Sequence, residues 1–180
     1  MKRQTTLTLC IVGVAFTATA TFSFLPDYLT KKMEKCLTKL FDKNIEYRAV
    51  ETDELYAINH QIYTVHQADT ISGYSIISRG LGCKIGGCDK PSTTDSVTFE
   101  QFYYMTAFDA NKKVKKVRVL EYTADHGYQI GGRGWLKQFE KGDHFTVGEN
   151  IDAISGATIS VKSITNGVNT QVELLQKNFD

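Results

Sequence analysis

The sequence has little proline, no low-complexity segment, no internal repeat and almost no net charge. Its 21 basic and 20 acidic residues give a formal charge of +1. A nucleic-acid-binding protein usually has a strongly basic face, so this balance argues against that class. No phosphate-binding loop, hydrolase elbow or catalytic pair of carboxylates is found either. At 180 residues, of which 42% are hydrophobic, the chain is long enough for one domain with a real core.

One long apolar run stands apart from this ordinary composition. Lys2 and Arg3 form a basic start, and residues 7–25 then carry no charge. That length lies within the range of about 17–25 residues for a helix that crosses a bilayer. Residues 18–20 are small-x-small, typical of a signal-peptide cleavage site, whereas the apolar residues up to Leu25 favour a retained anchor. Either interpretation predicts an extracytoplasmic protein, periplasmic or on the outer face of the cytoplasmic membrane.

The pattern after the leader predicts an α+β fold with a twisted, largely antiparallel sheet and helices packed on one side of it. Residues 99–108 and 114–122 are rich in aromatic and β-branched residues and flank a turn-like segment, which indicates a hairpin. Apolar residues at helical spacing predict the last helix over residues 159–175. Asp27 is expected to cap the first helix. The other predicted elements are a helix over 27–41, extended segments over 46–67 and 73–81, loops over 83–95 and 123–134, and a short helix over 135–140.

The segment Asp152–Ser160, D-A-I-S-G-A-T-I-S, is the most informative part of the sequence. It predicts a tight turn that leads into the last helix. Gly156 and its small neighbours leave room for a ligand, and the amides and dipole of a helix start favour an anion such as phosphate. Ser155 or Thr158 could equally cap the helix with no ligand present. The residues alone leave both interpretations open.

This segment resembles the flavinylation motif of the FMN-binding domain family, which includes the covalent-flavin subunits of sodium-translocating NADH:quinone reductase and of Rnf-type complexes. The resemblance covers about residues 97–176, with the hairpin, W-L-K-Q-F at 135–139 and the final helix. It implies FMN joined through a phosphoester bond to Thr158. The other motif positions are Asp152, Ser155, Gly156, Ala157 and Ser160.

The resemblance also implies a division of the chain and a partner. Residues 1–26 are the signal peptide or anchor, 27–72 an N-terminal helix and strands, and 73–180 the FMN-binding domain, with 27–180 one structural unit. A threonine hydroxyl is a weak nucleophile, and no base lies beside Thr158 in the sequence, so self-modification is not expected. A separate, metal-dependent flavin transferase would cleave FAD and leave FMN on the threonine.

The loop after the hairpin departs from the family pattern. Many relatives carry E-T-P-G there, whereas this chain has T-A-D-H-G-Y at residues 123–128. Gly127 is expected to keep the backbone role. His126, Tyr128 and Trp135 are either contacts of the flavin ring, by hydrogen bonding or stacking, or ordinary packed loop residues.

The cysteines and histidines give a second, weaker set of candidates. Cys83 and Cys88 are separated by four residues, which favours a structural disulfide over a redox-active pair. Cys36 falls on the apolar stripe of the first helix and is expected to be buried. No metal site is expected, because the histidines are scattered without paired spacing: His60, His66, His126 and His144.

Together these observations predict an electron-transfer flavoprotein rather than a complete enzyme. Its partners would be the flavin transferase, a membrane electron donor and a downstream redox acceptor, with membrane attachment through residues 7–25 if the leader is retained. Two alternatives from other classes remain at this point. One is an exported binding module without a cofactor, and the other is a thiol–disulfide protein that uses Cys83 and Cys88.

Overall fold

The structure, a computed structural model, places five antiparallel strands in one sheet whose order follows the chain. Each strand pairs with the next one, so the sheet is a simple meander. The strands are β1 (Ile45–Ala49), β2 (His60–Gln67), β3 (Thr70–Lys84), β4 (Phe99–Asp109) and β5 (Val114–Tyr122). The residues described are 25–51, 60–84, 99–123, 126–140 and 142–179, without the side chains of Cys83 and Lys84.

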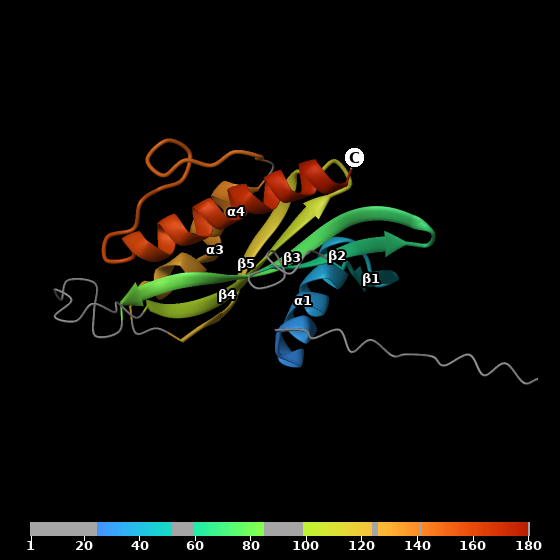
Figure 1. Cartoon of the computed structure of the whole chain (residues 1–180), viewed down its shortest axis with the longest axis horizontal. Helices are drawn as coiled ribbons and strands as arrows, with labels where there is room; N and C mark the ends of the chain where they lie inside the picture. Colours follow the sequence, from blue (N-terminus) through green and yellow to red (C-terminus); the bar gives the residue numbers. More distant parts are fainter. Residues whose placement is uncertain (1–24, 52–59, 85–98, 124–125, 141, 180) are drawn as a thin grey trace, which may run out of the picture.

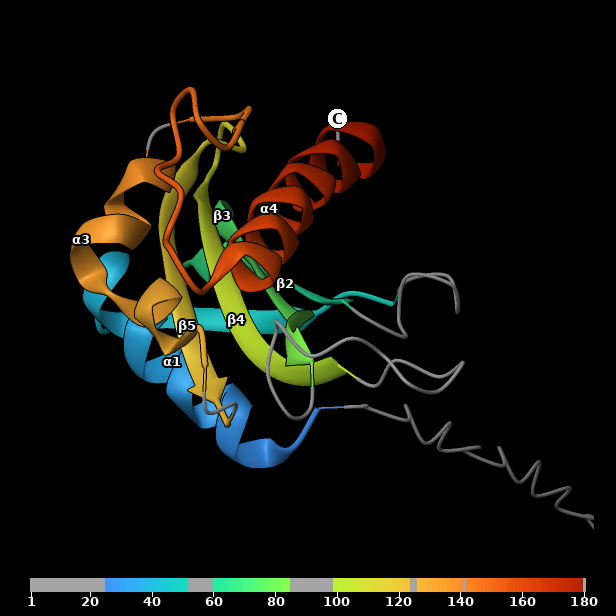
Figure 2. The ribbon, with the colours of Figure 1, turned by 90° about the vertical axis from the view of Figure 1, so that its left-hand side faces the viewer.

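Among the described residues, the two long helices cover opposite faces of this sheet, so the prediction that helices pack on one side only is wrong. α1 (Asp27–Leu40) lies on one face and α4 (Thr158–Asn178) on the other (Figures 1 and 2). Successive strand residues alternate between the two layers: Ile76 belongs to the core under α4 and Ile77 to the core under α1. Adjacent apolar residues such as these are typical of a strand covered on both faces, but they do not indicate which element covers each face.

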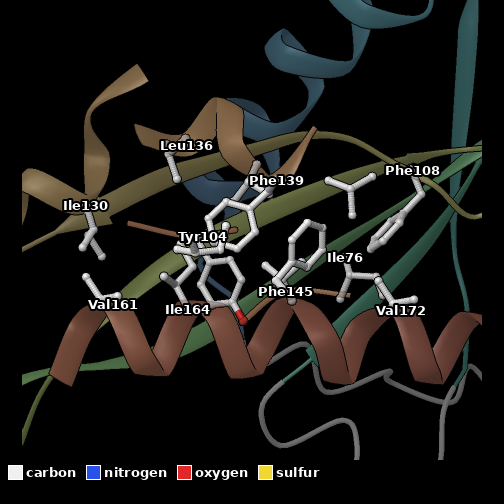
Figure 3. Packing of buried hydrophobic residues seen from close by; sticks show 14 of the residues in the cluster. Ile76, Tyr104, Phe108, Ile130, Leu136, Phe139, Phe145, Val161, Ile164 and Val172 are labelled. Atoms are coloured by element: carbon white, nitrogen blue, oxygen red, sulfur yellow. The ribbon is translucent and has the colours of Figure 1, made fainter. Parts of the chain in front are cut away.

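The core under α4 is built from the stripe predicted for the last helix. Val161, Ile164, Val168, Val172 and Leu175 are all buried and face aromatic side chains of the sheet and of the preceding loop (Figure 3). Burying side chains of this size is worth about 1.5–3 kcal/mol each. The stripe therefore fixes the rotation of α4 against the sheet.

The segment between β5 and α4 adds three short helices to the same face. These are η1 (Tyr128–Gly131), α3 (Arg133–Leu136) and η2 (Lys137–Phe139). The chain then returns along α4, where Asn169 holds it at both polar atoms of the Phe145 backbone: its Nδ2 donates to the carbonyl at 2.8 Å and its Oδ1 accepts from the amide at 2.9 Å. This loop therefore has a fixed path over the helix that it leads into.

Most predicted elements are confirmed within a few residues, including α1, the β4–β5 hairpin and α4. Asp27 is not the cap of α1, because the helix begins at this residue and Pro26 takes the cap position without a side-chain bond. Cys36 is buried and free, as expected. The signal or anchor segment, Cys88 and most of the 83–95 loop lie outside the described residues. Among the described helices, none is long and apolar enough to span a membrane.

Candidate functional site

The turn before α4 leaves the start of this helix without a side-chain cap. Thr158 is the first residue of the helix, and Ala157 takes the cap position. The Ala157 amide donates to the Ile154 carbonyl at 3.1 Å, and its own carbonyl accepts the Val161 amide at 2.9 Å. A methyl side chain cannot accept from the helix amides. The interpretation of this turn as a Ser or Thr capping turn is therefore wrong.

The missing cap gives the helix start the properties of an anion site. In an α-helix, amides before the first intrahelical bond have no carbonyl partner, which among the described residues applies to 158–160. The helix dipole adds a partial positive charge at the same end. An acceptor outside the helix can therefore bind these amides, as phosphate commonly does.

The Thr158 side chain is exposed at this end of α4, and its surroundings are open. Within the described part of the chain, its hydroxyl has no hydrogen-bond partner. Gly156 turns the chain with a φ of +77°, and no heavy atom lies within 4 Å of where a Cβ would be. A positive φ suits glycine, and the open space admits a bulky group or another protein. The hydroxyl is thus accessible for covalent modification.

Asp152 is held in place through its backbone. Its amide donates to Gln138 Oε1 at 2.8 Å, and its carbonyl accepts from Trp135 Nε1, also at 2.8 Å. The Trp135 ring packs edge-on against the buried Phe139 ring, with 5.5 Å between centroids. Because both backbone groups are occupied, the exposed Asp152 side chain is presented from a fixed position.

A second set of contacts ties the loop after β5 to the first turn of α4. Tyr122 Oη donates to the His126 carbonyl at 2.6 Å and lies 2.9 Å from Ser160 Oγ. Partial burial raises the pKa of Tyr122, while the Ser160 contact lowers it, with burial the larger effect. Gly127 packs beside both hydroxyls with a φ of +87°. We call these four residues, Tyr122, His126, Gly127 and Ser160, the loop latch.

The structure brings the predicted site residues together around the N-terminus of α4, although their contacts with a flavin remain predictions. His126 and Gly127 reach it through the loop latch, and Trp135 through Asp152. Tyr128 is 64% exposed beside them. Sequence reasoning missed Tyr122 and Gln138. The Tyr122 hydroxyl holds the loop at Ser160, and the Gln138 side-chain amide holds the backbone of Asp152. Nothing in their local sequence distinguishes them from other strand and helix residues.

The residues at this site fit a phosphate-bearing group. The fold and the site define a small α+β domain whose C-terminal helix starts with an accessible hydroxyl and unpaired amides. Residues 100–173 match the family model described as FMN-binding domain. This range agrees with the resemblance noted over residues 97–176 and supports an FMN-binding domain in this part of the chain. No curated protein matches the chain.

Proposed function

We propose that the protein is an extracytoplasmic electron-transfer flavoprotein that carries FMN covalently on Thr158 through a phosphoester bond. The observation that carries the proposal is the position of the motif at the start of α4. The threonine stands at the first helical position with its hydroxyl exposed, while the cap position is an alanine. Such an arrangement leaves the nearby amides for a phosphate.

The residues around Thr158 would divide the work of holding the cofactor. The amides at the start of α4 would donate hydrogen bonds to the phosphate oxygens. Tyr128, the most exposed aromatic residue near this site, would be available to stack on the ring. FMN itself, when bound, supplies one- and two-electron chemistry, and the protein positions it and tunes its potential.

Asp152 would serve the attachment step rather than electron transfer. Its carboxylate is exposed while its backbone is fixed by Gln138 and Trp135. A carboxylate presented in this way suits the metal of a flavin transferase, since Mg²⁺ prefers oxygen ligands. The transferase would break the diphosphate of FAD, join the FMN phosphorus to the Thr158 oxygen and release AMP. The hydroxyl proton would pass to a base of the transferase.

The location outside the cytoplasm and the redox partners rest on the sequence of the leader. The uncharged run over residues 7–25 supports export or anchoring. A covalent bond would suit such a compartment, where a dissociated flavin could not readily be replaced. The donor would be a membrane electron-transfer protein, and the acceptor a downstream redox protein.

The test is co-expression of the full chain with a flavin transferase. The intact mass should increase by one FMN less one water, and flavin fluorescence should survive denaturing electrophoresis. Thr158→Ala should abolish both signals. Thr170→Ala is a matched control, because it removes an exposed threonine from the same helix. A product that is unmodified at Thr158 when a known substrate of the same transferase is labelled would contradict the proposal.

A further inference from the structure

A cavity of about 390 Å³ lies away from Thr158, between α1, β5 and α3. Its lining includes Cys36 and Lys39 from α1, Val117 and Val119 from β5, and Leu136 from α3. Figure 2 shows the C-terminal part of α1 and α3 beside the same strand, β5. Because β5 is an edge strand, the cavity opens along the side of the sheet. We call it the edge groove.

The polar residues of the edge groove are all basic. Lys39, Lys116, Arg118 and Arg133 line it, and they come from three different elements. Of these four residues, only Lys116 has an ion pair within the described part of the chain, with Glu140 at 2.6 Å. The groove therefore concentrates positive charge in a chain whose net charge is only +1. A concave surface with one sign of charge attracts ligands of the opposite sign.

From this geometry we propose that the edge groove binds an acidic, carboxylate-rich peptide segment of a partner protein. The apolar lining from Val117, Val119 and Leu136 would accommodate the aliphatic part of such a segment. The guanidinium groups of Arg118 and Arg133 suit carboxylates, which they can bind through two hydrogen bonds. Complementary charge of this kind accelerates and orients a transient encounter.

Two other anionic surfaces fit the groove less well. A nucleic acid would need a broader basic face than one short groove. A membrane would be expected near the start of α1, which follows the apolar leader in sequence, yet Lys39 lies about 18 Å further along the helix at 1.5 Å per residue. The groove therefore suits a segment of a soluble partner better than a membrane surface.

The position of the groove connects it to the candidate flavin site. Arg133 and Leu136 belong to α3, which also contains Trp135, the residue that donates to the Asp152 carbonyl. A segment bound in the groove would therefore contact the helix that holds the start of the motif. If the proposed function is right, this places the docking surface one short helix away from the flavin. Binding of the segment itself does not require the flavin.

The experiment uses the full chain made without a transferase, and a hexaglutamate peptide as the probe. Trp135 is the only tryptophan and lies next to the groove, so its fluorescence reports binding. We expect a saturable change at low salt that weakens as salt screens the charges. At roughly 0.2–1 kcal/mol for an exposed pair, each lost cation should weaken binding by about 1.4- to fivefold. Arg118→Gln/Arg133→Gln should therefore weaken it by about two- to 25-fold.

The controls separate the groove from general charge effects. Lys177→Ala removes an exposed lysine from the far end of α4 and should leave binding unchanged. Urea unfolding checks that each variant has the same unfolding midpoint as the parent chain. Lys39→Glu provides a second, independent change in the groove. Hexalysine should give no saturable signal.

Three results would overturn the proposal. The first is no saturable hexaglutamate signal, in which case the cations only protect the edge strand from unwanted pairing. The second is binding of inorganic phosphate as tightly as hexaglutamate, which would identify a small-anion site. The third is binding to phosphatidylglycerol vesicles that depends on Arg118 and Arg133 without any binding of hexaglutamate. None of these outcomes depends on whether Thr158 is flavinylated.

Discussion

Replacing Gly127 with alanine should break the loop latch and destabilise the domain. The Gly127 φ of +87° lies in a region that L side chains rarely adopt. A Cβ there would lie 2.6 Å from Tyr122 Oη and 2.8 Å from Ser160 Oγ. Both hydroxyls belong to the contact that joins the loop to α4, and both would have to move. The alanine therefore combines backbone strain with the loss of hydrogen bonds.

The magnitude can be worked out from these two effects. A non-glycine residue in a left-handed conformation costs about 1–2 kcal/mol. Losing the Tyr122 bonds to the His126 carbonyl and to Ser160 would cost about 0.5–1.5 kcal/mol each. We therefore expect the free energy of unfolding to fall by about 2–5 kcal/mol. With a urea dependence of about 2 kcal/mol per molar, the unfolding midpoint should fall by about 1–2.5 M.

The assay is urea unfolding followed by Trp135 fluorescence, together with the rate of flavin incorporation by a transferase. Gly134→Ala is the matched control, because Gly134 is in α3 and a methyl group there would meet nothing within 4 Å. That variant should keep or slightly raise the midpoint, since alanine favours a helix. Flavin incorporation should slow only in Gly127→Ala. Equal midpoints for the two variants would refute the reasoning.

Two further predictions concern the core under α4. Gly167→Ala should lower stability by up to about 2 kcal/mol, because the new methyl overlaps the buried Tyr104 hydroxyl at a cost of about 1–3 kcal/mol, against a gain of about 1 kcal/mol in helix propensity. Urea unfolding measures the loss of stability. Adding Tyr104→Phe to the Gly167→Ala chain should recover part of it. No recovery would show that overlap with the Tyr104 hydroxyl is not the cause. His60 lies 2.6 Å from Ser78 Oγ, and burial lowers its pKa below the usual value of about 6.5. The unfolded chain then binds a proton that the folded chain does not, so stability should fall as the pH drops from about 7 to 5. His60→Gln should reduce that fall. Unfolding midpoints measured across this pH range check the prediction.

The local elements could be predicted from the sequence because each has a strong local pattern. The stripe of Val161, Ile164 and Val168 gives a helical period, and the β4–β5 hairpin has a polar turn between two apolar runs. The placement of α1 on the opposite face could not be predicted in this way. Ile76 and Ile77 are adjacent apolar residues that serve different layers, and their sequence does not indicate what covers each face.

The candidate site was predictable where the motif and the loop after the hairpin name the residues. Thr158, Gly156 and Asp152 follow from the D-A-I-S-G-A-T-I-S segment. The contacts that position them come from residues distant in sequence, as when Tyr122 reaches Ser160 across the loop. A hydrogen bond between side chains that meet only after folding leaves no local periodicity, and the single sequence therefore gave no sign of it.

The register of the threonine on the helix also explains why a capping interpretation fits the sequence but not the structure. At the cap position, a threonine hydroxyl would accept from the amides of the second or third helical residue and be turned inward. In the structure Thr158 is at the first helical position, where its side chain is exposed and no side chain caps the helix, while Ala157 is buried. One residue of register thus decides whether the hydroxyl satisfies the helix or remains available for modification.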